Sequence, residues 1–146
     1  MVPERIEREI FIDAPIEVVW AVITEPEHIN GWFGDVTEID LRPGGRVMFR
    51  WSEHGHAARG LVERVEPPHA FSFRWNRGPE AHASDDNYTL VEFTLHADGQ
   101  STRLTVAESG FRNLAMPDDE KQRDADDHRG GWEQELNELA EYASGL

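Results

Sequence analysis

Two side chains in this sequence could carry acid–base chemistry, Glu108 and His128. Glu108 follows Leu104 and Val106 at a spacing of two, which predicts that it shares the apolar face of a strand. A carboxyl group buried there must be paired or must raise its pKa. His128 could present a polar handle to a ligand or act as a general base, and it precedes Trp132 by about one helical turn. If Glu108 and His128 meet, they form a structural pair or an acid–base dyad, and we favour the structural pair.

Aromatic residues form a second candidate site. They alternate with polar residues in segments 46–52 and 71–76, so their rings share one face of each predicted strand. Such a face is either close-packed core or the wall of a ligand cavity. The indole N–H of Trp needs a partner, which suits a partly wet pocket. The expected ligand-binding set is Phe49, Trp51, Phe73, Trp75, Phe93, Glu108, His128 and Trp132.

Other kinds of site have weaker support. His54 and His56 are two apart in a turn without clustered acidic partners, whereas a metal site needs three or four converging ligands. The acidic stretch 118–127 lacks the alternating oxygen ligands around a glycine that calcium requires. The absence of Cys excludes thiolate ligands and cysteine catalysis. No phosphate-binding loop or nucleophile elbow is present. We therefore expect no metal and no cofactor.

The charge of the chain restricts its partners. The 146 residues carry a formal net charge of −15, which repels nucleic acid and anionic membrane surfaces. No apolar run reaches the ~20 residues that a membrane helix needs, and no signal peptide is visible. We expect a cytoplasmic protein with one domain over residues 1–146.

The chemistry-bearing residues need a sheet to position them. Alternating patterns predict strands at 6–12, 36–41, 46–52, 58–65, 71–76, 88–96 and 102–109. Helical spacing predicts a short helix over 16–23, capped by Asp13, and a second turn at 26–29. Residues 77–86 are interpreted as a polar, mobile loop. Since short turns join most of these strands, the sheet should be antiparallel.

A long helix is predicted after Pro117, because acidic residues 118–120 suit a helix N-terminus. One apolar stripe of this helix comprises His128, Trp132, Leu136, Leu139 and Ala143. Glu133, Glu135, Glu138 and Glu141 are expected to lie mostly off that stripe. Gly130-Gly131 should interrupt the helix, as a kink or as a place of close approach. The fold class is therefore α+β, with the helix packed on the aromatic face of the sheet.

Several motifs in order resemble one family over nearly the whole chain. They are Asp13-Ala14-Pro15, Val19-Trp20, Thr24-Glu25-Pro26, Trp32-Phe33-Gly34, Arg42-Pro43-Gly44-Gly45, Val65-Glu66-Pro67-Pro68, Trp75 and His128-x-x-Gly131-Trp132-x-x-x-Leu136-x-x-Leu139. This pattern resembles the START-like (SRPBCC) superfamily, in the branch named after the activator of the heat-shock-protein-90 ATPase. The resemblance implies a helix-grip fold, with a curved antiparallel sheet around the C-terminal helix and a hydrophobic cavity between them.

The resemblance leaves three functions open, because fold alone does not determine activity. The favoured one is non-covalent binding of a small hydrophobic or aromatic molecule in the cavity. The second is a cochaperone-like interaction module for a chaperone of the heat-shock-protein-90 type, with a role in stress response. The third is a cyclase- or hydrolase-type enzyme that uses Glu108 and His128. A homodimer is left open as well.

Overall fold

The computed structural model describes residues 2–76 and 87–146, without the side chains of residues 54 and 56. The strands are β1 (Arg5–Ile12), β2 (Val36–Ile39), β3 (Arg46–Trp51), β4 (His56–Glu66), β5 (Ala70–Asn76), β6 (Tyr88–Asp98) and β7 (Ser101–Ser109). The helices are α1 (Ile16–Thr24), α2 (Pro26–Ile29) and α3 (Asp118–Ser144), with short 3₁₀ turns at Ser52–His54 and Phe111–Asn113. The loop predicted over 77–86 lies outside the described residues.

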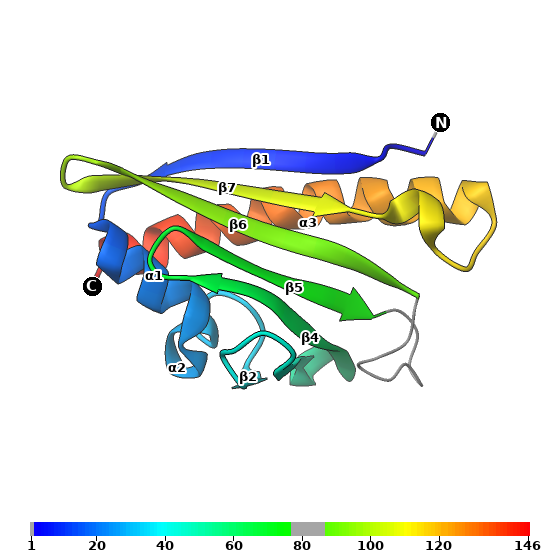
Figure 1. Cartoon of the computed structure of the whole chain (residues 1–146), viewed down its shortest axis with the longest axis horizontal. Coiled ribbons are helices and arrows are strands. Elements are labelled where there is room, and N and C mark those ends of the chain that lie inside the picture. The colour runs from blue at the N-terminus through cyan, green and yellow to red at the C-terminus, as the bar shows by residue number, and fades with distance from the viewer. Residues whose placement is uncertain (1, 77–86) are drawn as a thin grey trace.

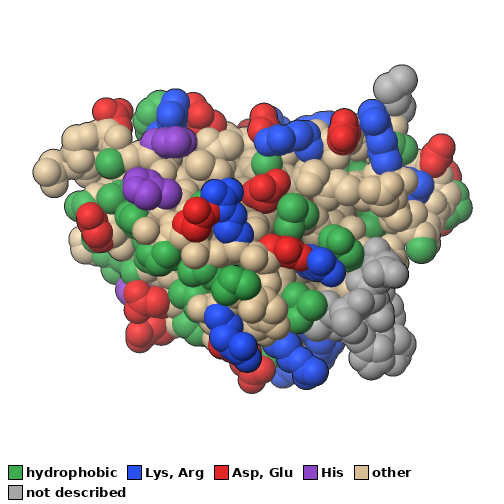
Figure 2. Space-filling view, viewed as in Figure 1, with side chains coloured by type: hydrophobic (Ala, Val, Ile, Leu, Met, Phe, Trp, Pro, Cys, Tyr) green, Lys and Arg blue, Asp and Glu red, His purple; other side chains and the backbone are tan. Residues whose placement is uncertain are grey.

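Within the described residues, the seven strands form one antiparallel sheet in the order β1-β7-β6-β5-β4-β3-β2. The strands curve around α3, which runs along one face of the sheet. The helices α1 and α2 lie near the C-terminal end of α3 (Figure 1). The predicted α+β helix-grip architecture is therefore confirmed. Figure 2 shows the sheet face that points away from α3, where acidic and basic side chains are interspersed.

Alternation along the strands determines which side chains reach the core. In β6, Thr89, Val91 and Leu95 are fully buried, and in β7 Leu104, Val106 and Glu108 are buried, while most of their neighbours in sequence are more exposed, Ala107 excepted. Successive side chains of a strand point to opposite faces, so these residues all point toward α3. The inner face of β7 thus places Glu108 beneath the helix, as the spacing predicts.

The start of α1 corrects one expectation. The N-cap residue is Pro15 rather than Asp13, and no side chain caps the helix. Because the helix begins at Ile16, Asp13 lies two residues before the cap position. Capping needs a side chain at the cap itself to reach the first free N–H groups.

The C-terminal helix corrects a second expectation, namely that Gly130-Gly131 interrupts it. The helix α3 continues through Gly130 and Gly131 without interruption. A Cβ atom at either position would meet open space, so close approach of another element is not the reason for these glycines. The apolar stripe is confirmed, since Trp132, Leu136, Leu139 and Ala143 are buried. None of the described helices has an apolar stretch of the length needed to span a membrane.

Candidate functional site

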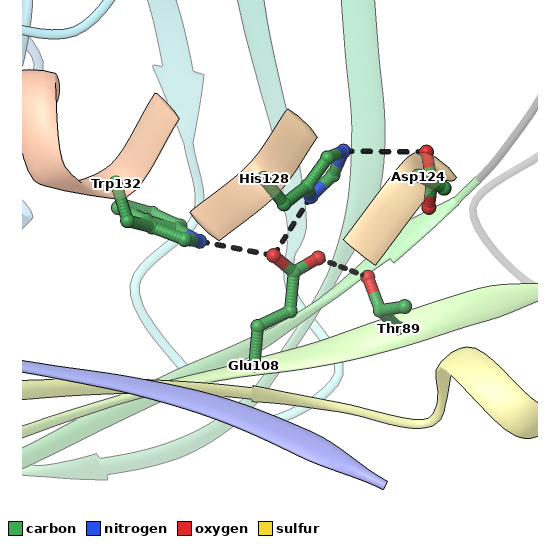
Figure 3. Close-up of polar contacts among 5 residues, drawn as sticks. All are labelled: Thr89, Glu108, Asp124, His128 and Trp132. Carbon is green, nitrogen blue, oxygen red and sulfur yellow. Dashed lines mark hydrogen bonds and ion pairs between the residues drawn. The ribbon is translucent and has the colours of Figure 1, made fainter. Parts of the chain in front are cut away.

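A fully buried carboxylate, Glu108, joins the sheet to α3 (Figure 3). Its Oε1 accepts a hydrogen bond from the indole Nε1–H of Trp132 at 2.9 Å and lies 2.8 Å from Nδ1 of His128. Its Oε2 accepts a hydrogen bond from the Thr89 hydroxyl at 2.5 Å. Thr89 and Glu108 lie on adjacent strands, where Val91 is the direct partner of Glu108. Both oxygens of this buried acid are thus satisfied by the protein itself.

His128 lies between two carboxylates. Its Nδ1 faces Glu108, and its Nε2 lies 3.5 Å from Oδ1 of Asp124, one turn earlier on α3 (Figure 3). The imidazole is held by rings as well, because Phe111 approaches it edge-on at 5.9 Å and Trp75 lies 5.8 Å away. This arrangement can hold α3 in a fixed rotation and position on the sheet.

The sequence-predicted site residues fall into two groups. Phe49, Phe73 and Phe93 are 3%, 2% and 4% exposed and surround a void of about 10 Å³. A space of that size holds a single water molecule at most. These three rings pack as core, and the expected cavity between sheet and helix is filled at this depth.

The other group lies around an open pocket with a volume of about 190 Å³. Trp51, Trp75, His128 and Trp132 line it, all from the predicted set. Trp51 and Trp75 are half-buried, and their rings stack at 6.1 Å with an angle of 18° between the planes. Trp132 is almost fully buried and meets Trp75 edge-on at 6.3 Å. The structure therefore brings together four of the eight predicted residues at one surface opening, directly above Glu108.

Four further residues line this pocket that sequence reasoning did not assign to it, namely Phe33, Asp127, Gly131 and Glu135. Phe33 stacks on Trp132 with a centroid distance of 5.7 Å and also contacts Trp51 and Trp75. Phe33 belongs to the Trp32-Phe33-Gly34 motif, so that motif was the available signal. Gly131 leaves room in the pocket wall, because a Cβ atom there would project into open space.

Glu135 is the exception among the four glutamates that were expected to lie mostly off the helix stripe, since the other three are exposed. It follows His128 by seven residues, which is about two helical turns, so the two side chains point in nearly the same direction. Its side chain is half-buried, and its Oε2 has no hydrogen-bond partner among the described residues. Burial, followed by the negative charge of Glu138, raises the pKa of Glu135 to about 7.

The raised pKa of Glu135 predicts a pH-dependent stability. The unfolded chain releases this proton near the ordinary value of 4.5, whereas the folded protein holds it until about pH 7. The unfolded chain therefore binds fewer protons in that range, and this group lowers stability as pH rises from about 4.5 to 7. We expect Glu135→Gln to stabilise the protein at pH 8 by on the order of 1 kcal/mol, after allowing for partial solvent screening.

The measurement is urea unfolding of the unsubstituted protein and of Glu135→Gln at pH 5 and pH 8. The gain should be larger at pH 8 than at pH 5. Glu141→Gln removes the same charge from an exposed position of α3 and should show no such difference. Equal gains in the free energy of unfolding from the two variants at both pH values would show that Glu135 is solvated like an exposed glutamate.

A second hollow, of about 410 Å³, adjoins the aromatic pocket and shares Trp51 and Glu135 with it. Its acidic members are Asp35, Glu53, Glu135 and Glu138. The Ser52 backbone N–H donates a hydrogen bond to Asp35 at 2.8 Å, and this bond is the main reason that the pKa of Asp35 lies below its usual value. Within the described part of the chain, no group of three or more His, Asp or Glu side chains is arranged to hold a metal ion.

The sequence and fold have recognisable relatives. Residues 13–144 match the family described as Activator of Hsp90 ATPase homolog 1-like protein. The structure is similar to protein MLL2253 from Mesorhizobium loti, with 26% identity and a TM-score of 0.78 over 94% of this chain and 95% of that one. CalU16 from Micromonospora echinospora is 27% identical, with a TM-score of 0.69 over 96% of this chain and 76% of its own.

Two further matches are more limited. The Aha1 dimer from Colwellia psychrerythraea shares the fold at 17% identity, with a TM-score of 0.76 over 96% of each chain. A stretch of 97 residues is 28% identical to intercellular adhesion molecule 1 from Pan troglodytes and covers 64% of this chain. This chain spans only 18% of that relative's length, so the match carries no functional argument.

Proposed function

Since the chain belongs to the family of Activator of Hsp90 ATPase homolog 1-like proteins, we propose that it uses the family's fold to bind a small aromatic or apolar molecule. The site is the open aromatic pocket, and no covalent step takes place there. One observation carries this proposal: two half-buried Trp rings, Trp51 and Trp75, border an opening with Trp132 and Phe33 at its base. Ligand pockets are concave and mostly apolar, with a few polar groups that orient the ligand.

The volume of the pocket limits the ligand to a small one. About 190 Å³ is close to the ~150 Å³ of an engineered apolar cavity that takes up benzene. Drug-sized ligands generally occupy pockets of about 300–1,000 Å³. A single ring therefore fits this pocket, with any substituents directed outward.

The carboxylate network favours binding over acid–base chemistry. Glu108 is fully buried and does not line the pocket, and its oxygens already accept hydrogen bonds from Thr89 and Trp132. A general acid or base must come within hydrogen-bond reach of the atom it protonates or deprotonates. We assign Glu108 and His128 the role of positioning α3, and thereby the wall of the pocket.

Closing the pocket from one side tests the proposal. Gly131→Leu directs a side chain into the opening, while Gly130→Leu adds the same side chain at a neighbouring position that does not line it. Both changes raise helix propensity similarly. The readout is intrinsic Trp fluorescence during titration with a panel of single-ring compounds, together with the melting temperature of each variant.

We expect saturable quenching or a blue shift with some members of the panel. Gly131→Leu should weaken that binding by about tenfold or more, equivalent to ~1.4 kcal/mol, whereas Gly130→Leu should not change it. The proposal fails if no compound saturates the signal at millimolar concentration. It also fails if the two leucine variants bind equally well.

A further inference from the structure

The wall of the aromatic pocket continues into an acidic surface. The pocket and the adjoining hollow share Trp51 and Glu135 and lie next to each other along α3, and the two together are called the groove below. Its acidic residues are Asp35, Glu53, Asp127, Glu135 and Glu138. Among the described residues that line it there is no Lys or Arg, and the only other titratable side chain is His128.

This acidic character is local rather than a reflection of the net charge alone. Basic side chains are numerous on the sheet face that points away from α3 (Figure 2). Arg64 pairs there with Glu66, and Arg74 pairs with Glu63. Positive charge is thus present on the surface, and Arg50 lies near enough to Asp35 to help lower its pKa, but the described lining of the groove contains no Lys or Arg.

Glu135 is the acid at the junction of the two hollows. Its Oε2 is buried from solvent without a hydrogen-bond partner in the described part of the chain. A partly desolvated, unpaired carboxylate interacts more strongly with an incoming cation than an exposed one does, because water screens it less. The Trp51 ring lines the same junction, and the face of an indole ring also attracts cations.

We propose that the ligand is a cationic aromatic molecule, with one ring in the aromatic pocket and a protonated amine against Glu135 in the acidic hollow. This inference rests on the proposed function, which it narrows to a chemical class. A ring without a charge would leave Glu135 unpaired. A bare metal ion does not fit, because the described residues provide no cluster of metal ligands.

Three probes of similar size test the charge directly: 2-phenylethylamine, 2-phenylethanol and 3-phenylpropionate. They share a phenyl ring and differ in carrying an ammonium, a hydroxyl or a carboxylate group. Their affinities are compared at pH 7.5 and low ionic strength by Trp fluorescence and by calorimetry. We expect the amine to bind about five- to tenfold more tightly than the alcohol, and the carboxylate to bind least.

Glu135→Gln should abolish the preference for the amine over the alcohol, measured as the ratio of their two affinities in the same variant. Glu141→Gln is the matched control, because it removes one charge from an exposed site on the same helix outside the groove. Comparison with Glu141→Gln corrects for the attraction that a net charge of −15 exerts on any cation. The preference should survive in Glu141→Gln.

The outcomes separate this inference from the proposed function. If the amine and the alcohol bind with equal affinity, and Gly131→Leu weakens both, the pocket binds aromatic rings and the cationic inference is wrong. If both glutamine variants lose the preference equally, net charge is responsible and Glu135 is not the anchor. If none of the three probes binds, the cationic inference and the pocket proposal both lose their support.

Discussion

Replacement of Glu108 with alanine should lower the free energy of unfolding by about 3–5 kcal/mol, because it removes a fully buried side chain together with three hydrogen bonds inside the protein. The Trp132 indole N–H, the Thr89 hydroxyl and Nδ1 of His128 would each lose the hydrogen bond to Glu108. A cavity would remain as well, which adds to the cost. Since whole domains are stable by only about 5–15 kcal/mol, this is a large fraction of the total.

Glu108→Gln is the matched control for size. Its amide oxygen can still accept hydrogen bonds from Trp132 and His128, and the Thr89 hydroxyl can turn to accept a hydrogen bond from the amide NH₂. We expect a loss of about 1–2 kcal/mol, well below that of alanine. Urea unfolding followed by far-ultraviolet circular dichroism measures both. Equal losses for the two variants would mean that the hydrogen bonds of Glu108 contribute little to stability.

Trp132→Ala should be similarly costly, at about 3–5 kcal/mol, because a large buried ring is removed from a packed core. Trp132 is 4% exposed and contacts Phe33, Phe93 and Trp75 through its ring. Loss of the Trp132 N–H also leaves Oε1 of Glu108 with one hydrogen-bond donor fewer. Circular dichroism during urea unfolding is the suitable measurement, since removal of Trp132 changes the fluorescence signal itself.

Trp132→Phe separates the two contributions, because phenylalanine keeps most of the ring contact but has no N–H. It should cost clearly less than alanine. In a double-mutant cycle, Trp132→Phe and Glu108→Ala should be non-additive by about 0.5–3 kcal/mol, since each change removes the hydrogen bond that the two residues share. Additive losses would contradict the direct contact. Trp51 and Trp75, which are only half-buried, are better positions at which to probe binding without unfolding the protein.

The sequence predicts the fold more completely than the site, for physical reasons. Period-two alternation places Glu108 and Val106 on the inner face of β7, since strand geometry alone determines which way they point. Helical spacing likewise places Trp132 and Leu136 against that sheet. Whether an inward-facing ring is core or pocket wall depends on its depth under α3, which periodicity does not encode.

Glu135 illustrates what periodicity misses. Its helical position is at the border of the buried stripe, where packing against a distant segment decides the outcome. Here the deciding neighbours are the loop and strand end that bring Asp35 and Trp51 to the same hollow. The Gly130-Gly131 pair is a similar case, because a glycine that leaves space open and one that permits a kink have the same appearance in a sequence.

The strand order has a consequence for how the protein folds. The first strand, β1, pairs with β7, with Arg5 opposite Ser109 and Ile12 opposite Thr102, so each contact closes a loop of about a hundred residues. Such high contact order slows folding, since loop-closure entropy is lost before the contacts form. On the ribosome, β1 has no partner until β7 emerges, and the helix that covers the sheet emerges later still. The groove along α3 is therefore among the last parts of this domain to form, and the unpaired first strand is open to aggregation until β7 and α3 have emerged.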